Sequence, residues 1–193
     1  MVSRSNDNKQ VKGSIILVTG PSRSGKSEWA ESLAVQIGKQ VIYVATAKVD
    51  PDDLEWLARL EKHQQRRPSN WKTLLVPVEL AETILEHSQL GCCLLIDSLG
   101  TWVANLLIQE TMVWQKTVKD LKESLLQTSS TIIFVAEETG WGLVPTYPLG
   151  RKFRDRLGGL TRELGAIANP VYLVTGGHVL NLSGLGVPLP PPN

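Results

Sequence analysis

Hydrophobic residues along this chain gather in short continuous runs that are separated by longer, mostly polar segments. Apolar runs of this length are typical of strands covered on both faces, because such strands do not alternate between apolar and polar positions. The runs predict strands at Ile15–Thr19, Val41–Ala45, Cys92–Ile96, Thr131–Ala136 and Val171–Thr175. A further short strand at Leu74–Val78 contains Pro77, which would confine it to an edge of the sheet.

The segments between these runs have apolar residues at helical spacing. They are Lys26–Ile37, Asp52–Gln65, Leu99–Ile108, Val113–Leu126 and Leu149–Ala168. Strands that alternate with helices predict a three-layer α/β domain with a mostly parallel central sheet. We expect one such domain over residues 14–187, after a flexible polar segment (1–13) and before a proline-rich tail (188–193).

Composition and charge limit the classes of protein that the chain can represent. Of its 193 residues, 42% are hydrophobic and 20% are charged, which is typical of a globular protein rather than a disordered one. The net charge of +1 argues against a protein that coats nucleic acid or an anionic membrane. No apolar stretch is long enough to span a bilayer, and the start lacks the apolar core of a secretory signal, so we expect a cytoplasmic protein. The adjacent Cys92 and Cys93 should be small buried residues on opposite faces of one strand.

The segment between the first predicted strand and the first predicted helix carries the strongest chemical signal. It fits the pattern G-x-x-x-x-G-K-[S/T] at every position, with the residues Gly20, Pro21, Ser22, Arg23, Ser24, Gly25, Lys26 and Ser27. The glycines let the backbone approach phosphate oxygens, which the loop N–H groups and the helix N-terminus bind. We expect Lys26 to reach the outer phosphates and the Ser27 hydroxyl to hold Mg²⁺. The pattern therefore predicts a nucleoside triphosphate site.

A carboxylate at the end of a neighbouring strand is the second part that such a site needs. Asp97 ends the run Cys92–Ile96 and is the natural magnesium ligand, although an aspartate there could also cap the following helix. Glu137 and Glu138, which end another predicted strand, are competing carboxylates. The phosphate loop does not specify the reaction, because kinases, GTPase switches and motor ATPases share it.

A histidine with basic neighbours lies at the end of the helical segment 52–65. Arg59, His63 and Arg67 are spaced by four residues and share one face if the helix continues. Guanidinium groups suit phosphate oxygens, and a neutral imidazole can attack phosphorus to form a covalent intermediate. Residue chemistry alone favours a simpler interpretation, a solvated basic helix end.

Six sequence segments together resemble a known enzyme family over roughly residues 15–180. They are I-L-V-T-G-x-x-R-S-G-K-S at Ile16–Ser27, Y-V-A-T-A at Tyr43–Ala47, R-L-x-x-H-x-x-x-R-P-x-x-W at Arg59–Trp71, L-I-D-x-L-x-T-W-V-x-N-L-L at Leu95–Leu107, E-x-G-x-G-x-V-P at Glu138–Pro145 and R-x-F-R-D-x-x-G at Arg151–Gly158. The chain resembles the bifunctional adenosylcobinamide kinase / adenosylcobinamide-phosphate guanylyltransferases of cobalamin biosynthesis. The phosphate loop is generic, whereas the histidine segment in this order is specific.

The resemblance implies a P-loop NTPase fold of the RecA-like type and two activities. ATP or GTP would phosphorylate adenosylcobinamide, and GMP would then pass from GTP through a guanylyl-histidine at His63 to give adenosylcobinamide-GDP. It implies that Lys26 and His63 are catalytic, that Mg²⁺ is the cofactor, and that the protein is a homo-oligomer, with a trimer as one form. The implied nucleotide contacts outside the loop are Ala45, Thr46, Ala47, Gln64, Gln65, Arg66, Arg67 and Asp97.

Several residues depart from the family pattern. Leu75 stands where members often carry an acidic residue, and Glu137 and Ser98 stand where Asn and Cys are common. Two other functions stay open: a plain small-molecule kinase with a structural His63, and a GTP-dependent regulatory switch. Trp141, which lies between two glycines, could contact a flat corrin ring, although core packing or a subunit contact is the commoner use of tryptophan.

Overall fold

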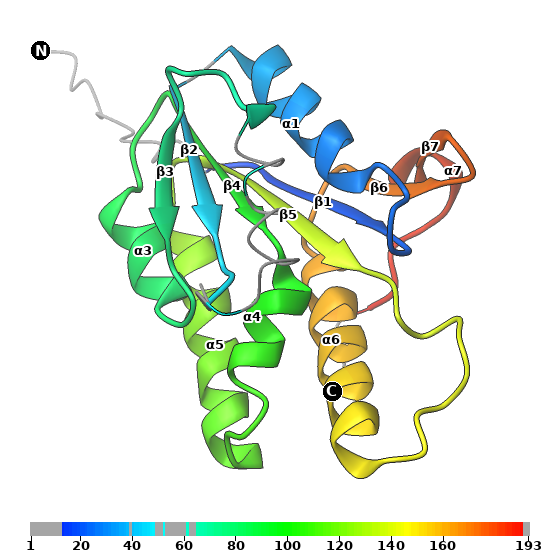
Figure 1. Ribbon diagram of the computed structural model, residues 1–193. Coiled ribbons are helices and arrows are strands. Elements are labelled where there is room, and N and C mark those ends of the chain that lie inside the picture. The colour runs from blue at the N-terminus through cyan, green and yellow to red at the C-terminus, as the bar shows by residue number, and fades with distance from the viewer. Residues whose placement is uncertain (1–12, 39, 49–51, 53–60, 62–64, 191–193) are drawn as a thin grey trace, which may run out of the picture.

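The strands form one continuous sheet in the computed structural model, which describes residues 13–38, 40–48, 52, 61 and 65–190 (Figure 1). They are β1 (Ile15–Gly20), β2 (Gln40–Ala45), β3 (Lys72–Leu75), β4 (Cys92–Asp97), β5 (Thr131–Glu137), β6 (Val171–Thr175) and β7 (His178–Asn181). Their order across the sheet is β3-β2-β4-β5-β1-β6-β7. Only the pairing of β7 with β6 is antiparallel among the described strands. The carboxyl ends of β1, β2, β4 and β5 therefore meet at one edge, where ligands bind in open α/β sheets.

Helices cover both faces of the sheet, which gives the three layers that the sequence predicts (Figure 1). They are α1 (Lys26–Ile37), α3 (Leu80–Glu86), α4 (Leu99–Asn105), α5 (Thr111–Gln127), α6 (Pro148–Gly165) and the short α7 (Leu182–Leu185). The helix α1 packs Ala30, Leu33 and Ala34 on one face, whereas α3, α4, α5 and α6 cover the other. The fold is the predicted three-layer α/β fold with a mostly parallel sheet, and the phosphate loop follows β1.

Successive residues of the buried strands point into two separate hydrophobic clusters. On β1, Leu17 belongs to the cluster beneath α3–α6, and its neighbour Val18 belongs to the cluster beneath α1. Cys92 and Cys93 divide in the same way and are both buried, as predicted. This alternation at a period of two explains why the strands read as continuous apolar runs.

The observed elements follow most of the predicted boundaries. The helix α1 begins and ends where the spacing predicts, and Gly38 closes it in the left-handed conformation at a φ of 66°. The strand β3 lies at the edge and ends before Pro77, whereas α4 ends at Asn105, three residues before the predicted end. The sequence did not predict α3, α7 or β7.

Some predictions fall on residues outside the described part of the chain. The segment 1–13 is described only at its last residue, and the helical segment 52–65 only at residues 52, 61 and 65. Residues 188–190 of the predicted tail are exposed and belong to no helix or strand. Among the helices that the structure describes, none combines the length and the hydrophobicity that crossing a bilayer requires.

Candidate active site

The phosphate loop joins β1 to α1 and leaves the start of the helix uncapped. Gly25 precedes the helix at a φ of 93°, a left-handed conformation that glycine adopts without steric cost, and Arg23 has a φ of 59°. No side chain caps the first turn of α1 within the described residues. The first N–H groups of the helix are therefore open to an anionic ligand.

The loop packs closely against the neighbouring strand β6. A Cβ atom on Gly20 would lie 2.3 Å from the carbonyl oxygen of Val174 and 2.8 Å from Ser24 Oγ. The carbonyl belongs to the backbone and cannot rotate away. The first glycine of the motif is thus required for packing as well as for ligand access.

Replacement of Gly20 by alanine should therefore damage both the fold and the loop. We expect Gly20→Ala to lower the free energy of unfolding by about 1–3 kcal/mol, as overpacking does, and to weaken nucleotide binding. The control is Gly142→Ala, because in the described part of the chain no atom beyond its two chain neighbours lies within 4 Å of a Cβ built there. Denaturant unfolding and nucleotide titration measure the two effects, and equal stabilities for the two variants would contradict the prediction.

Two polar groups of the phosphate loop, the Lys26 side chain and the Ser24 hydroxyl, are buried. Lys26 is buried, and its Nζ donates a hydrogen bond of 3.4 Å to the carbonyl oxygen of Pro21. The hydroxyl of Ser24 is buried with no hydrogen-bond partner among the described residues. Buried polar atoms usually have partners, so these groups indicate that the loop is built around a ligand.

Asp97 ends β4 at the same edge of the sheet, with β5 between it and β1. Neighbouring strands are about 4.8 Å apart, so Asp97 lies about 10 Å across the sheet from β1. The Tyr43 hydroxyl donates a 2.8 Å hydrogen bond to Asp97 Oδ2. Burial, and then the charge of Asp97, raises the pKa of Tyr43, so the phenol stays protonated as a donor.

Hydrogen bonds at the start of α4 show that Asp97 does not cap this helix. Ser98, and not Asp97, is the N-cap, and its Oγ accepts from the N–H of Thr101 at 3.4 Å. Glu137 Oε2 accepts from the N–H of Gly100 at 2.9 Å. Asp97 is therefore available to a ligand, because its carboxylate retains acceptor capacity beyond the bond from Tyr43.

Two arginines of the histidine segment contact Tyr43 and the helix α1. Arg67 places its guanidinium carbon 3.3 Å from the ring centre of Tyr43, a stacked cation–π contact. Arg66 forms ion pairs with Glu28 at 2.7 Å and Glu31 at 3.5 Å, both on α1. Burial raises the pKa of Glu31, and the nearby Arg66 opposes that shift. The end of the histidine segment is thus fixed to the helix that begins at the phosphate loop.

The other predicted contacts differ in how far the structure describes them. His63 and Gln64 lie outside the described residues, whereas Gln65 donates a 3.3 Å hydrogen bond to Glu61. Ala45, Thr46 and Ala47 are all buried. The Thr46 hydroxyl donates to the carbonyl of Ser98 at 2.7 Å and accepts from its N–H at 3.0 Å. Thr46 therefore joins the ends of β2 and β4, and its contact with nucleotide stays a prediction.

Three residues of this site were not identified from the sequence. In the sequence, Tyr43 is one more position in an apolar run that predicts a buried strand. Glu28 and Glu31 fit the polar side of the helix α1. The available signal was the tyrosine inside Y-V-A-T-A, because a buried phenol needs a hydrogen-bond partner. Leu75, the departure from the acidic pattern, pairs with Ala45 and is 65% exposed at the ligand edge.

The chain is similar to known proteins in both sequence and structure. The sequence model of the family described as "Cobinamide kinase / cobinamide phosphate guanyltransferase" matches residues 16–182. The chain is 37% identical to the bifunctional adenosylcobalamin biosynthesis protein CobP of Pseudomonas aeruginosa over 87% of its length and 96% of that protein. It is 33% and 32% identical to the CobU proteins of Escherichia coli and Salmonella typhimurium, over 90% of its length and 98% of theirs.

Similarity to solved structures extends to much lower sequence identity. A protein from Pyrococcus horikoshii superimposes with a TM-score of 0.54 at 8% identity, covering 89% of this chain and 86% of that one. The flagellar accessory protein FlaH from Methanocaldococcus jannaschii has a TM-score of 0.47 at 16% identity, covering 93% and 82%. The first of these supports the fold class and carries no information about the reaction.

Proposed function

The chain belongs to the cobinamide kinase / cobinamide phosphate guanyltransferase family, and from this premise we propose how its own residues divide the two activities. Family membership confirms the predicted enzyme class and its place in cobalamin biosynthesis. The observation that carries the residue assignment is the connection at α1. The helix starts at the phosphate loop and forms ion pairs, through Glu28 and Glu31, with Arg66 of the histidine segment.

In the kinase step, the phosphate loop binds ATP or GTP and the γ-phosphoryl group passes to the hydroxyl of adenosylcobinamide. Phosphoryl transfer depends mainly on positioning and on neutralisation of charge. The uncapped N-terminus of α1 binds the phosphate oxygens, and Lys26 exchanges its weak contact with the Pro21 carbonyl for the outer phosphates. The loop residue Arg23 adds a further positive charge.

Mg²⁺ fits the donors that face this edge. Ser27 lies in the first turn of α1, and Asp97 offers a carboxylate that Tyr43 orients. Mg²⁺ prefers oxygen ligands and keeps several waters, so one hydroxyl and one carboxylate are sufficient protein ligands. Within the described residues no cluster of three or more His, Cys, Asp or Glu could hold a metal. When bound, Mg²⁺ would offset the charge of the triphosphate.

In the guanylyltransferase step, His63 attacks the α-phosphorus of GTP and pyrophosphate leaves. The phosphorylated corrinoid then attacks the same phosphorus, and the bond from phosphorus to the imidazole breaks. A covalent intermediate of this type divides one difficult transfer into two easier ones. Arg66 and Arg67 orient the segment and its phosphates, and Gln64 and Gln65 belong to the same nucleotide contacts.

The experiment that tests this proposal follows both products on the purified protein. Adenosylcobinamide is incubated with ATP or GTP labelled at the γ-phosphorus, and separately with GTP labelled at the α-phosphorus. We expect label in the corrinoid in both cases, as the monophosphate and as the GDP adduct. Phosphorylation of the corrinoid without any nucleotidyl transfer would support the plain kinase instead, and GTP hydrolysis alone would support the switch.

We further propose that the enzyme is a homo-oligomer, with three subunits as the form that the family resemblance implies. Exposed apolar side chains gather near the C-terminus, and grouped exposed apolar residues are typical of interaction surfaces. They are Val179, Leu180, Leu182, Leu185, Val187 and Leu189. A cytoplasmic location, where nucleoside triphosphates are available, is part of the same proposal.

Light scattering at micromolar protein concentration tests the assembly. We expect the wild type to have three times the mass of one chain, and Leu185→Asp to lower that mass, because it places a charge among the apolar side chains. Leu90→Asp is the matched control, since Leu90 is equally exposed, at 69% against 72% for Leu185, but lies in the turn before β4. A monomeric wild type would contradict the proposal.

A further inference from the structure

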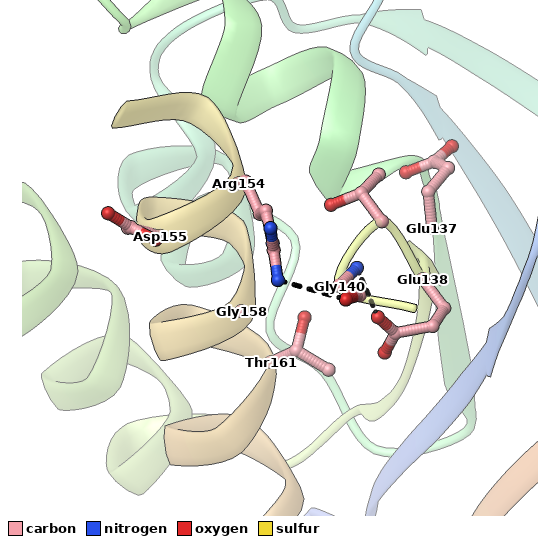
Figure 2. Close-up of a pocket in the computed structure, with 8 residues that line it drawn as sticks. Glu137, Glu138, Gly140, Arg154, Asp155, Gly158 and Thr161 are labelled. Atoms are coloured by element: carbon pink, nitrogen blue, oxygen red, sulfur yellow. Dashed lines mark hydrogen bonds between the residues drawn. The ribbon is translucent and has the colours of Figure 1, made fainter. Parts of the chain in front are cut away.

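A polar cavity of about 310 Å³ lies beside the phosphate loop, between the end of β5 and helix α6. It is lined by Glu137, Glu138, Thr139, Gly140, Arg154, Asp155, Gly158 and Thr161. Figure 2 shows Glu138, Arg154 and Thr161 around Gly140, with the carboxylate of Asp155 directed away from them. None of these residues belongs to the phosphate loop or to the histidine segment.

Backbone contacts place this cavity next to the phosphate loop. The strand β5 pairs with β1, and Glu137 is the register partner of Gly20, the first residue of the loop. The N–H of Glu138 donates a 2.8 Å hydrogen bond to the carbonyl oxygen of Gly20. A group held in the cavity would thus approach the loop from the side of β5.

One polar group in the cavity, the hydroxyl of Thr161, is buried and has no hydrogen-bond partner among the described residues. The neighbouring polar groups are better satisfied, since Arg154 donates to the carbonyl of Gly140 at 3.0 Å and Glu138 Oε1 accepts from the N–H of Gly140. An unpaired buried hydroxyl in a polar cavity indicates a ligand that supplies a hydrogen bond.

The charge of the lining decides which kind of ligand fits. The lining residues carry three carboxylates and one guanidinium, so their net negative charge would repel a phosphate and accept a neutral donor such as a hydroxyl or an amide. The volume is at the lower end of small-molecule sites, which begin at about 300 Å³. That space admits a short amide arm, and the macrocycle of a corrinoid must stay outside.

We infer that this cavity is the acceptor subsite of the kinase step, and that Glu138 binds the hydroxyl at the end of the corrinoid's amide arm and accepts its proton. The inference rests on the proposed function. As the O–H bond breaks, the proton passes to the Glu138 carboxylate and the oxygen forms a bond to the γ-phosphorus. The bond from the γ-phosphorus to the bridging oxygen breaks, and the nucleoside diphosphate leaves with that oxygen.

Glu138 suits this role better than Glu137 does. Glu137 is held by the N–H of Gly100 at the start of α4, whereas the partner of Glu138 lies in its own loop. Outside the cavity, the same loop continues through Trp141 and Leu143, which are 65% and 97% exposed. An apolar ring could lie against these side chains while its arm enters the cavity.

Kinase rates with adenosylcobinamide and saturating nucleotide test the inference. We expect Glu138→Gln to lower kcat by about 10²–10⁴-fold, the usual effect of losing a proton acceptor. Thr161→Val should raise KM for the corrinoid about 2–10-fold at unchanged kcat, and Thr161→Ser should restore it. Glu123→Gln, which makes the same substitution on the exposed side of α5 where Glu123 pairs with Lys119 at 3.6 Å, should stay within about twofold of the wild type.

Two further measurements separate this inference from the proposed function. Labelling of the protein by GTP carrying ³²P at the α-phosphorus needs no acceptor, so Glu138→Gln should keep it, and equilibrium dialysis reports corrinoid binding without turnover. A kcat unchanged by Glu138→Gln, or labelling lost together with kcat, would overturn the inference. A wild type that binds adenosylcobinamide through Thr161 but never phosphorylates it would instead remove the kinase assignment and, with it, the role of Glu138.

Discussion

The His63→Ala enzyme should take up no label from GTP that carries ³²P at its α-phosphorus. Removal of the imidazole removes the only atom to which the guanylyl group is proposed to bind, so the loss should be complete rather than partial. On the wild type the label should be labile to acid and stable to alkali, as a phosphoramidate on histidine is. Denaturing electrophoresis after incubation with labelled GTP measures the result.

The chain supplies a matched control for this experiment, because it contains two other histidines. His178 lies on β7, where its Nδ1 is 2.9 Å from the carbonyl oxygen of Gly176, and it is exposed. We expect His178→Ala to label like the wild type. Phosphorylation of adenosylcobinamide by His63→Ala should stay within about threefold of the wild type, since that step uses the phosphate loop. Persisting label on His63→Ala would disprove the covalent mechanism.

Lys26→Ala should lower kcat of the kinase step by roughly 10²–10³-fold, the size of effect seen when one preorganised charge-stabilising donor is removed. The reason is the place of the side chain. Lys26 is buried at the start of α1, and its amine lies against the carbonyl of Pro21, so its charge is held at the phosphate loop and away from bulk solvent. The fold should tolerate the change, because the bond to Pro21 is long, at 3.4 Å.

Lys116→Ala is the control for charge removal. Lys116 is exposed on α5 and pairs with Asp120 four residues later. Exposed ion pairs of this kind contribute little to the free energy of folding. Its kinase rate should equal that of the wild type. Lys26→Arg should not rescue the rate of Lys26→Ala, because a planar guanidinium does not replace a compact ammonium in a close-packed loop. A kcat for Lys26→Ala within tenfold of the wild type would contradict the role assigned to the lysine.

The sequence predicted the parts of the fold that local rules determine. The phosphate loop, the helix after it and the buried strands each depend on residues that are adjacent in the chain. Where tertiary contacts decide, the prediction was incomplete. Apolar spacing continues to Ile108, yet α4 ends at Asn105, whose side-chain amide donates to the carbonyls of Thr46 and Pro77. Ile108 is left 89% exposed.

The sequence contains a local signal for β7, the glycine pair before it, from which this strand was not predicted. Gly176 and Gly177 have φ values of 58° and 76°, and two such residues form the tight turn that joins antiparallel strands. For the site, the carboxylate at Asp97 followed from the position of β4, but its partner Tyr43 did not. Hydrogen bonds between strands that are not adjacent in sequence depend on strand order, which the chain's local pattern does not contain.

The position of β1 in the sheet sets when the site can form. Its two neighbours, β5 and β6, both come from the second half of the chain, and the paired hydroxyls of Ser14 and Thr131 are 117 residues apart in sequence. Protein synthesis begins at the N-terminus, so the phosphate loop is among the first segments made. The strand β1 before it can pair on both sides only after most of the chain has been made. Pairing between such distant residues also slows folding. We therefore expect a nucleotide to stabilise only the nearly complete protein, and an N-terminal fragment that carries the whole motif should not bind it.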